Sequence, residues 1–224
     1  MSKFRVLLYG ATGALGSGIA SVYTSHGWEV FPMVRKSSSL PNEILMPNEE
    51  FPHVFDAVVF AQGANMNGSY SATTHEQVTN IFEANVGFIV DQIKHLMEAN
   101  AIAKKGKVVI LSSLAEIFTR KEKLAYTISK AAVGGLVRSL AVDLGRSHQI
   151  LVNGILPGVV ESPMTAATLD PAQFAHLVES TPVGNLPTPQ DIGNSVFLLG
   201  SNLNTAISGQ SLLVDNAHSI TYLP

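Results

Sequence analysis

The chain has 224 residues, of which 46% are apolar and 14% are charged, and its formal net charge at neutral pH is −3. These values suit one domain with a large core, and they give no electrostatic reason to expect nucleic acid or an anionic membrane as a partner. The absence of cysteine excludes disulfides, thiolate catalysis and cysteine metal sites, and the seven histidines lack metal-ligand spacing, so we predict no metal site.

The first predicted elements are a strand from Phe4 to Tyr9, a glycine-rich turn and a helix from about Leu15 to His26. The turn carries glycines at positions 10, 13 and 16, in the spacing G-x-x-G-x-x-G. Glycines between a strand and a helix let the backbone approach a pyrophosphate, and the helix N-terminus supplies amide donors. The turn therefore indicates a nucleotide site, with a flexible turn as the alternative. The charge-free stretch Val6–Ser25 is too rich in glycine and hydroxyl groups for a signal peptide or a membrane span, so we expect a cytoplasmic protein.

Apolar runs and helical patterns alternate along the rest of the chain. Strand-like runs lie at Val30–Val34, Ala57–Ala61, Val108–Leu111, Ile150–Ile155 and Leu212–Val214, and helix-like segments lie at Glu76–Asn100, Tyr126–Ser147 and Pro189–Leu199. The last helix has a clear start, because Thr188 can cap it and Pro189 suits the first helical position. This alternation predicts an α/β fold over residues 1–224: a single Rossmann-type domain with a doubly wound parallel sheet and helices on both faces.

The segment 36–56 is unusually short for this kind of fold. It contains Pro41, Pro47 and Pro52, which leave no room for a full helix. Glu43–Met46 fits a short strand.

Tyr126 and Lys130 lie four residues apart in a predicted helix, so their side chains share one face. A lysine ammonium in this position favours the phenolate and lowers the pKa of the phenol from its ordinary value of about 10. Ser113 follows the run Val108–Leu111, at the sheet edge where open α/β folds bind ligands. The alternatives are an ordinary helix face and a structural serine at a strand end.

Several motifs occur in an order that resembles the short-chain dehydrogenase/reductase family, and its classical branch most closely. They are the glycine turn, Phe60-Ala-Gln-Gly63, Asn85-Val-Gly, Ser113 with Tyr126 and Lys130, Asn153-Gly-Ile-Leu-Pro157-Gly158, and Gly209-Gln-Ser-Leu-Leu-Val-Asp215. Three features depart from the family pattern. The segment 36–56 is short, Phe60-Ala61-Gln62-Gly63 stands where the family has Asn-Asn-Ala-Gly, and the glycine spacing is commoner in the extended and atypical branches.

The resemblance implies catalytic roles for Asn85, Ser113, Tyr126 and Lys130. Tyr126 would give its proton to a carbonyl oxygen as hydride arrives from the nicotinamide, and Ser113 would hold and polarise that oxygen. Lys130 would bond the nicotinamide ribose and bias Tyr126 toward ionisation. Asn85 would link the lysine to solvent through an ordered water.

The resemblance also implies a set of cofactor-binding residues. Gly10, Thr12, Gly13, Leu15 and Gly16 would line the pyrophosphate, Ala61 and Gly63 the adenosine ribose, and Pro157, Gly158, Val160 and Ser162 the nicotinamide, beside Tyr126 and Lys130. Arg35 and Lys36 follow the second strand, where NAD-preferring enzymes carry an acidic residue. Cations at that place favour the extra phosphate of NADP(H) over NAD(H), and a solvated basic turn is the alternative.

These features together predict an NADP(H)-dependent oxidoreductase, a carbonyl reductase acting on a small-molecule carbonyl or secondary alcohol. The alternative is a catalytically silent NADPH-binding regulator or scaffold, and a serine hydrolase lacks its G-x-S-x-G motif. The resemblance further implies a homodimer or homotetramer that pairs the helices Glu76–Asn100 and Tyr126–Ser147. An apparent surplus of apolar residues supports this pairing: Ile81, Ile89, Ile93, Leu96, Met97, Leu136, Val137 and Leu140.

The substrate pocket is expected to mix apolar side chains with one acidic group. Its predicted wall comprises Leu114, Glu116, Ile117, Phe118, Val159 and the segment 162–179. The connection 162–188, with a short helix at Pro171–Glu179, is expected to act as a lid. Two basic clusters are interpreted as solvated loop charge: Lys104, Lys105 and Lys107, and Arg120, Lys121 and Lys123.

Overall fold

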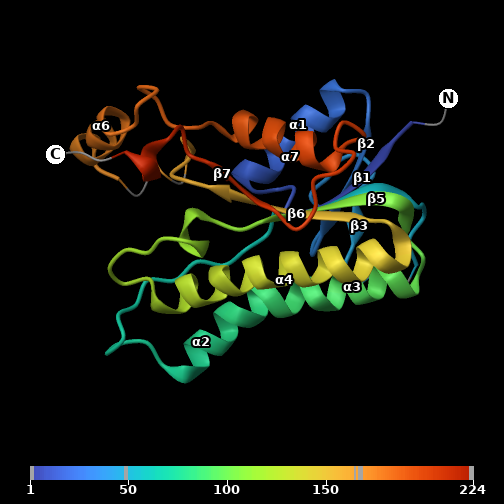
Figure 1. Cartoon of the computed structure of the whole chain (residues 1–224), viewed down its shortest axis with the longest axis horizontal. Helices are drawn as coiled ribbons and strands as arrows, with labels where there is room; N and C mark the ends of the chain where they lie inside the picture. The colour runs from blue at the N-terminus through green and yellow to red at the C-terminus, as the bar shows by residue number, and fades with distance from the viewer. Residues whose placement is uncertain (1–2, 48–49, 164, 166–168, 222–224) are drawn as a thin grey trace.

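Seven parallel strands form one sheet in the computed structural model, which describes residues 3–47, 50–163, 165 and 169–221 (Figure 1). The described strands are β1 (Arg5–Tyr9), β2 (Glu29–Val34), β3 (Ile44–Leu45), β4 (Phe55–Phe60), β5 (Ile102–Leu111), β6 (Leu151–Pro157) and β7 (Ser211–Val214). Their order across the sheet is β3-β2-β1-β4-β5-β6-β7. This order reverses direction between β1 and β4, the switch point beside which open α/β sheets bind ligands.

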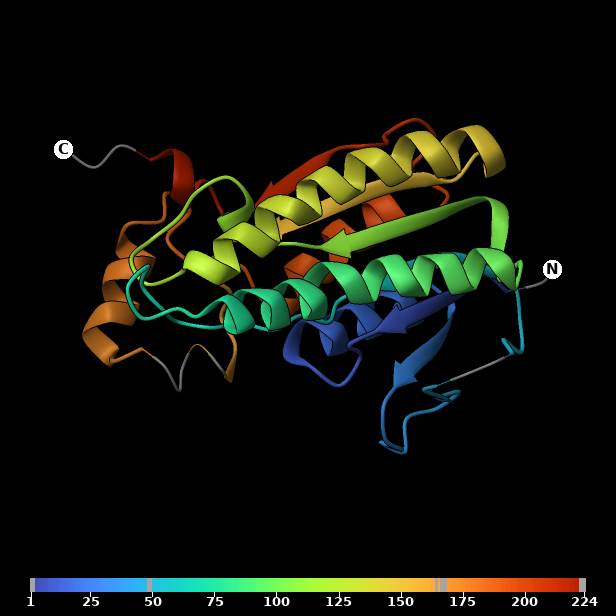
Figure 2. The same cartoon turned by 90° about the horizontal axis from the view of Figure 1, so that it is seen from below.

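Helices cover both faces of the sheet (Figures 1 and 2). On one face, α1 (Ala14–Ser25) and α7 (Pro189–Gly200) bury Ile19, Val22, Ile192 and Val196 against the strands. On the other face, α3 (Phe88–Glu98) and α4 (Leu124–His148) contribute Ile93, Leu96, Val133 and Val137 to a second core. The predicted doubly wound Rossmann-type architecture is confirmed.

The strand β5 begins at Ile102, earlier than the predicted Val108. Lys104, Lys105 and Lys107 therefore lie in a strand, and their interpretation as loop residues was wrong. β3 confirms the short strand expected within Glu43–Met46, and the described part of segment 36–56 contains no helix.

The predicted continuous helix Glu76–Asn100 is interrupted. It consists of α2 (His75–Phe82), a π-helical turn at Glu83–Gly87 and α3. Such turns insert an extra residue into a helix and often occur at functional sites. This one contains Asn85, whose residue exposure is only 1%.

The expected apolar surplus on these helices is absent, because the residues belong to the core. Ile81, Ile89, Ile93, Leu96 and Val137 are buried, and Met97, Leu136 and Leu140 pack partly buried against the same cluster. The large apolar side chains that remain exposed on α2, α3 and the first turns of α4 are Phe82, Val90, Leu124 and Ile128.

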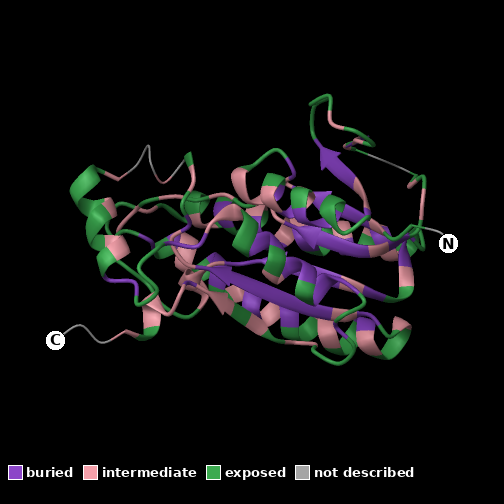
Figure 3. Cartoon of the chain, turned by 90° about the horizontal axis from the view of Figure 1, so that it is seen from above, coloured by how far each residue is buried: buried purple, intermediate pink, exposed green. Residues whose placement is uncertain are grey.

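The carboxyl ends of the strands point toward the end of the molecule that carries α6 (Pro171–Glu179) (Figure 2). No residue of α6 is buried, in contrast to the central strands (Figure 3). In the part of the chain that the structure describes, no helix is both long and apolar enough to cross a membrane.

Candidate active site

A cavity of about 470 Å³ lies at the carboxyl ends of β1, β4, β5 and β6. Most of the predicted site residues line it: Gly10, Thr12, Gly13, Leu15, Gly16, Ala61, Gly63, Ser113, Tyr126, Lys130, Pro157, Gly158, Val160 and Ser162. Arg35, Lys36 and Asn85 do not. Arg35 and Lys36 are exposed beyond the end of β2, and Asn85 is buried in the π turn.

The glycine turn shapes this cavity so that backbone can approach a ligand. Gly10 has a φ of +78°, and a Cβ there would lie 2.6 Å from the backbone nitrogen of Gln62. A Cβ on Gly16 would overlap the carbonyl oxygen of Gly10. α1 begins at Ala14, within this glycine stretch, with Gly13 at its N-cap, so the free amides of its first turn lie beside the cavity.

Gln62 also lines the cavity, and both atoms of its side-chain amide are buried without a hydrogen-bond partner in the described structure. An unpaired buried amide costs about 1–3 kcal/mol, so it calls for a polar ligand. The glycine cradle, the helix N-terminus and this amide together fit a bound dinucleotide. The sequence Phe60-Ala61-Gln62-Gly63 differs from the family's Asn-Asn-Ala-Gly at this point, which was a signal for Gln62. Sequence reasoning nevertheless assigned Gln62 no role.

Asn85 connects the π turn to both the β4 loop and α4. Its Oδ1 accepts from the Ala64 amide at 2.7 Å, and its Nδ2 donates to the Ala64 carbonyl at 3.0 Å and to Ser129 Oγ at 2.9 Å. Ser129 Oγ in turn donates to the carbonyl oxygen of Tyr126 at 2.8 Å. Asn85 thereby fixes the turn of α4 that carries Tyr126 and Lys130. Sequence reasoning missed Ser129, although a serine inside a helix commonly bonds a carbonyl one turn back.

Two lysine ammonium groups lie near the ring of Tyr126. Lys123 Nζ is 5.3 Å and Lys130 Nζ is 5.8 Å from the centroid of its ring. Burial raises the pKa of the phenol, whereas the hydroxyl of Ser113 and the charge of Arg120 act to lower it. We expected Lys130 to lower the pKa of the phenol, and this expectation is wrong for the protein without ligand, because the effect of burial on that pKa is the largest. The phenol stays protonated near neutral pH, which is the form that donates a proton.

Lys130 is buried, with a residue exposure of 4%. Burial lowers the pKa of its ammonium to about 8, and the carboxylate of Glu116 acts in the opposite direction. Gly63 leaves space beside it, because a Cβ there would lie 3.5 Å from Lys130 Nζ and 3.2 Å from Asn85 Oδ1. The lysine thus faces the cavity across a glycine.

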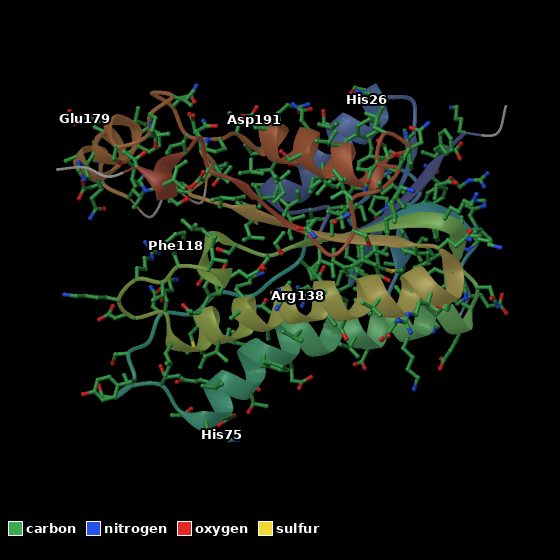
Figure 4. The ribbon with its side chains drawn as sticks, viewed as in Figure 1. His26, His75, Phe118, Arg138, Glu179 and Asp191 are labelled. Carbon is green, nitrogen blue, oxygen red and sulfur yellow. The ribbon has the colours of Figure 1, made fainter. Side chains whose placement is uncertain are left out.

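A second cavity, of about 260 Å³, adjoins the first. Both are lined by Asn65, Ser113, Tyr126, Pro157 and Gly158, so these residues form their common wall. The second cavity continues along the loop between β5 and α4, on which Figure 4 shows Phe118, at the same end of the molecule as Glu179 of α6.

The wall of the second cavity differs in charge from the expected one. Leu114, Phe118 and Val159 line it as predicted, but Glu116 and Ile117 do not. Glu116 instead packs against α4, where a Cβ on Gly134 would overlap its carboxylate. The charged groups among the described lining residues are Arg120 and Lys123, so the expectation of one acidic group in this wall was wrong.

Lys123 is not the solvated loop charge that we expected. Its residue exposure is 6%, and its Nζ donates to Asn65 Oδ1 at 2.6 Å. Arg120 and Lys121 are exposed, as predicted.

The turn after β2 is held by Glu43. Its carboxylate accepts from the Ser37 hydroxyl at 2.5 Å, from the Ser38 amide and hydroxyl at 2.9 and 3.0 Å, and from the Leu40 amide at 3.3 Å. These donors lower the pKa of Glu43 to about 2, so the group is ionised at neutral pH. The structure thus brings an acidic group to the turn that follows Arg35 and Lys36.

The predicted lid contains the expected short helix, and α6 begins with a capping box between Asp170 and Gln173. Ser162 Oγ accepts from the amide of Thr165 at 3.2 Å at the start of the segment. Residues 164 and 166–168 of the predicted lid lie outside the described residues.

Comparisons with known proteins agree with this geometry. A family model described as enoyl-(acyl carrier protein) reductase matches residues 34–216. The chain is 31% identical to the 3alpha-hydroxysteroid dehydrogenase of Mediterraneibacter gnavus, over 84% of this chain and 74% of the relative.

Solved structures share the fold over nearly the whole chain. The gluconate 5-dehydrogenase of Burkholderia cenocepacia, in complex with NADP and tartrate, has a TM-score of 0.88 at 18% identity and covers 99% of this chain and 97% of its own. The 3-oxoacyl-(acyl-carrier protein) reductase of Brucella melitensis, in complex with NAD, has a TM-score of 0.83 at 22% identity and covers 100% of both chains. The family match, the relative and the fold lead to one conclusion: the chain belongs to the short-chain dehydrogenase/reductase family of oxidoreductases.

Proposed function

We propose that the protein is an NADP(H)-dependent carbonyl reductase that acts on a small-molecule carbonyl or secondary alcohol. One observation carries the proposal: Ser113 and Tyr126 lie on the wall shared by the two cavities. A carbonyl oxygen at these two hydroxyls would face a nucleotide on one side and have space for its substituents on the other. The names of the relatives, which describe dehydrogenases and reductases, support the same reaction type.

The residues of the larger cavity would hold the cofactor, whose nicotinamide supplies the hydride when bound. Ser113 donates a hydrogen bond to the carbonyl oxygen, and this bond strengthens as the oxygen gains negative charge. Tyr126 gives its phenolic proton to that oxygen, so the carbon gains hydride, the oxygen gains a proton, and an alcohol forms. Lys130 stabilises the resulting phenolate through its charge, and Asn85 holds the turn of α4 on which both residues lie.

The preference for NADP(H) rests on Arg35 and Lys36, two exposed cations after β2. A guanidinium there suits the extra phosphate, because a charge-assisted hydrogen bond to phosphate is strong and can be bidentate. Glu43 opposes this preference with its own negative charge. The solved neighbours do not decide the question, since one binds NADP and the other NAD.

The proposal extends to assembly and to the segment 162–188. Phe82, Val90, Leu124 and Ile128 give α2, α3 and the start of α4 exposed apolar side chains, which favours a homodimer or homotetramer. The unburied helix α6, beside the carboxyl ends of the strands, favours a lid over the substrate.

Turnover with a panel of small carbonyl compounds tests the proposal. The assay follows the loss of NADPH absorbance in the presence of neutral ketones, aldehydes and keto acids, with NADH in parallel. Reduction of at least one carbonyl is the expected result. Binding of NADPH without turnover of any carbonyl or alcohol would instead support the silent binding protein.

A further inference from the structure

The smaller cavity carries two cations without a carboxylate partner. The ion pairs found in the described structure are Arg5 with Glu29 and Lys94 with Glu98, so neither Arg120 nor Lys123 belongs to one. Lys123 donates instead to the neutral amide oxygen of Asn65. A buried ammonium that lacks a counter-charge is costly, and an anion entering the cavity would remove that cost.

The position of Lys123 adds to this cost. It is the N-cap of α4, where the helix dipole already places positive charge, and its side chain makes no capping bond. The first turn of α4 carries no acidic residue either. A serine or aspartate at this position would stabilise the start of the helix better than lysine does. Residues that break a local stability rule in this way often lie at functional sites.

Fold maintenance does not account for the ammonium of Lys123. The segments around Gly68 and Lys123 are already joined through the backbone, where the Gly68 amide donates to the Glu122 carbonyl at 2.8 Å and the Leu124 amide donates to the Gly68 carbonyl at 3.3 Å. The side chain instead extends to Asn65 and over the ring of Tyr126. Its charge is therefore placed beside the reacting group.

We propose that Lys123 and Arg120 form an anion subsite, and that the substrate is a small keto acid, or the matching hydroxy acid, whose carboxylate binds there. The cavity volume of about 260 Å³ suits a small molecule, and Leu114, Phe118 and Val159 offer apolar surface for a short carbon chain. The ammonium of Lys123 is 5.3 Å from the centroid of the Tyr126 ring, so the carboxylate lies within a few bonds of the reacting carbonyl. This inference rests on the proposed carbonyl reduction for its reaction, but the subsite can be tested without turnover.

The test compares each acid with its own amide, which keeps the shape and removes the charge. Steady-state reduction is measured for pyruvate, acetoacetate and levulinate and for their primary amides, with the cofactor that the wild type accepts. The quantity of interest is the ratio of kcat/KM for acid over amide. Because both values come from the same preparation, a partly unfolded variant does not change the ratio.

We expect the wild type to prefer at least one acid to its amide. Lys123→Met should lower that ratio about 10- to 100-fold, chiefly through KM of the acid, since a charge-assisted hydrogen bond is lost. Arg120→Met should lower it only a few-fold, because that side chain is exposed. Lys121→Met removes the same charge from the same loop outside this cavity and should leave the ratio unchanged.

Three results would overturn the subsite. A wild type that reduces every amide better than its acid would show that the site does not recognise a carboxylate. Equal losses of kcat/KM for acid and amide in Lys123→Met would show that the lysine acts through Tyr126 or the fold. Calorimetric titration with levulinate and levulinamide, on protein saturated with oxidised cofactor, separates this question from catalysis. If no compound is turned over but levulinate binds more tightly to the wild type than to Lys123→Met, the subsite stands and the reductase proposal fails. If levulinate binds equally tightly to both proteins, the subsite is overturned.

Discussion

The ammonium of Lys130 donates to the carbonyl oxygen of Leu111 at 3.2 Å, at the end of β5. That oxygen is neutral, so the hydrogen bond does not balance the charge of a lysine whose exposure is only 4%. Burial therefore holds its pKa near 8 rather than 10.5. The protein bears the cost of a buried charge at the position where the proposed reaction needs one.

This cost predicts how stability depends on pH. Between about pH 8 and 10.5 the unfolded chain keeps the lysine proton that the folded chain has lost, so the lysine contribution to the free energy of unfolding rises with pH. At pH 7 both states are protonated and the full cost applies, on the order of 3 kcal/mol. Lys130→Met should therefore gain stability over the wild type at pH 7, and this difference should shrink by about pH 10.5.

Urea unfolding of both proteins from pH 7 to 10.5 measures this difference directly. Lys94→Met is the control for removing a lysine charge from the surface, because that lysine is exposed on α3. A constant difference between wild type and Lys130→Met would show that Lys130 is not a buried cation.

Replacing Tyr126 by phenylalanine should remove the proton donor and keep the ring beside Lys123 and Lys130. We expect kcat to fall by about 10²–10⁴ while cofactor binding and folding persist, because general acid catalysis contributes about that much. Steady-state kinetics and a cofactor titration check both parts. Tyr70→Phe, at a residue that is 87% exposed, should behave like the wild type. Unchanged turnover in Tyr126→Phe would exclude this phenol from the mechanism.

Sequence reasoning was sufficient where the determinants are local. The alternation of apolar runs and helices gave the sheet and its two helical layers, and Thr188 and Pro189 marked the start of α7, where the structure has a capping box between Thr188 and Asp191. The Ser113, Tyr126 and Lys130 motif also placed its residues on one cavity. Each of these rests on contacts close in sequence or on the parallel topology that brings strand ends together.

The failures concern side chains whose environment is set by distant partners. Lys123 is buried and donates to Asn65, 58 positions earlier, and no local pattern carries that information. Asn85 in the π turn donates a hydrogen bond to Ser129, 44 positions away. Glu43 reaches back to Ser37 and Ser38, which adds a negative charge beside the cations expected at that turn. Burial raises the pKa of Tyr126 for the same kind of reason, since it comes from the packed structure and not from the spacing to Lys130.

Arg35→Ala should weaken NADPH binding and leave NADH binding almost unchanged, because the partner of the arginine would be the extra phosphate. A charge-assisted hydrogen bond is worth about 1.5–3 kcal/mol, or about one to two decades in Kd. Calorimetric titration with both cofactors measures the two losses. Lys104→Ala removes an exposed cation from β5 and serves as the control for net charge. Equal losses for NADPH and NADH would contradict this role.

The exposed apolar side chains Val90 and Ile128 should lie in a contact between copies of the chain. They are 44% and 43% exposed in the single chain, and burying them would supply part of the driving force for association. Light scattering at micromolar concentration should give two or four times the chain mass of 23.8 kDa. Val90→Asp with Ile128→Asp should shift the protein toward monomer, whereas Val183→Asp, at another exposed valine, should not. A monomeric wild type would refute the predicted assembly.

The helix α6 should become protected only when ligands are bound. None of its residues is buried, so its hydrogen bonds open at little cost in the free protein, and local opening of this kind is typical of segments that close over a site. Hydrogen exchange is measured on the free protein and on the complex with cofactor and a substrate found in the carbonyl panel. Amides within Pro171–Glu179 should exchange fast in the free form and markedly slower in the complex, because closure buries them against the substrate. Helix α7, with Ile192 and Val196 fully buried, is the internal control and should be slow in both forms. Equal exchange of α6 in the two forms would mean that the helix does not respond to ligand, and the substrate would then enter and leave without a moving lid.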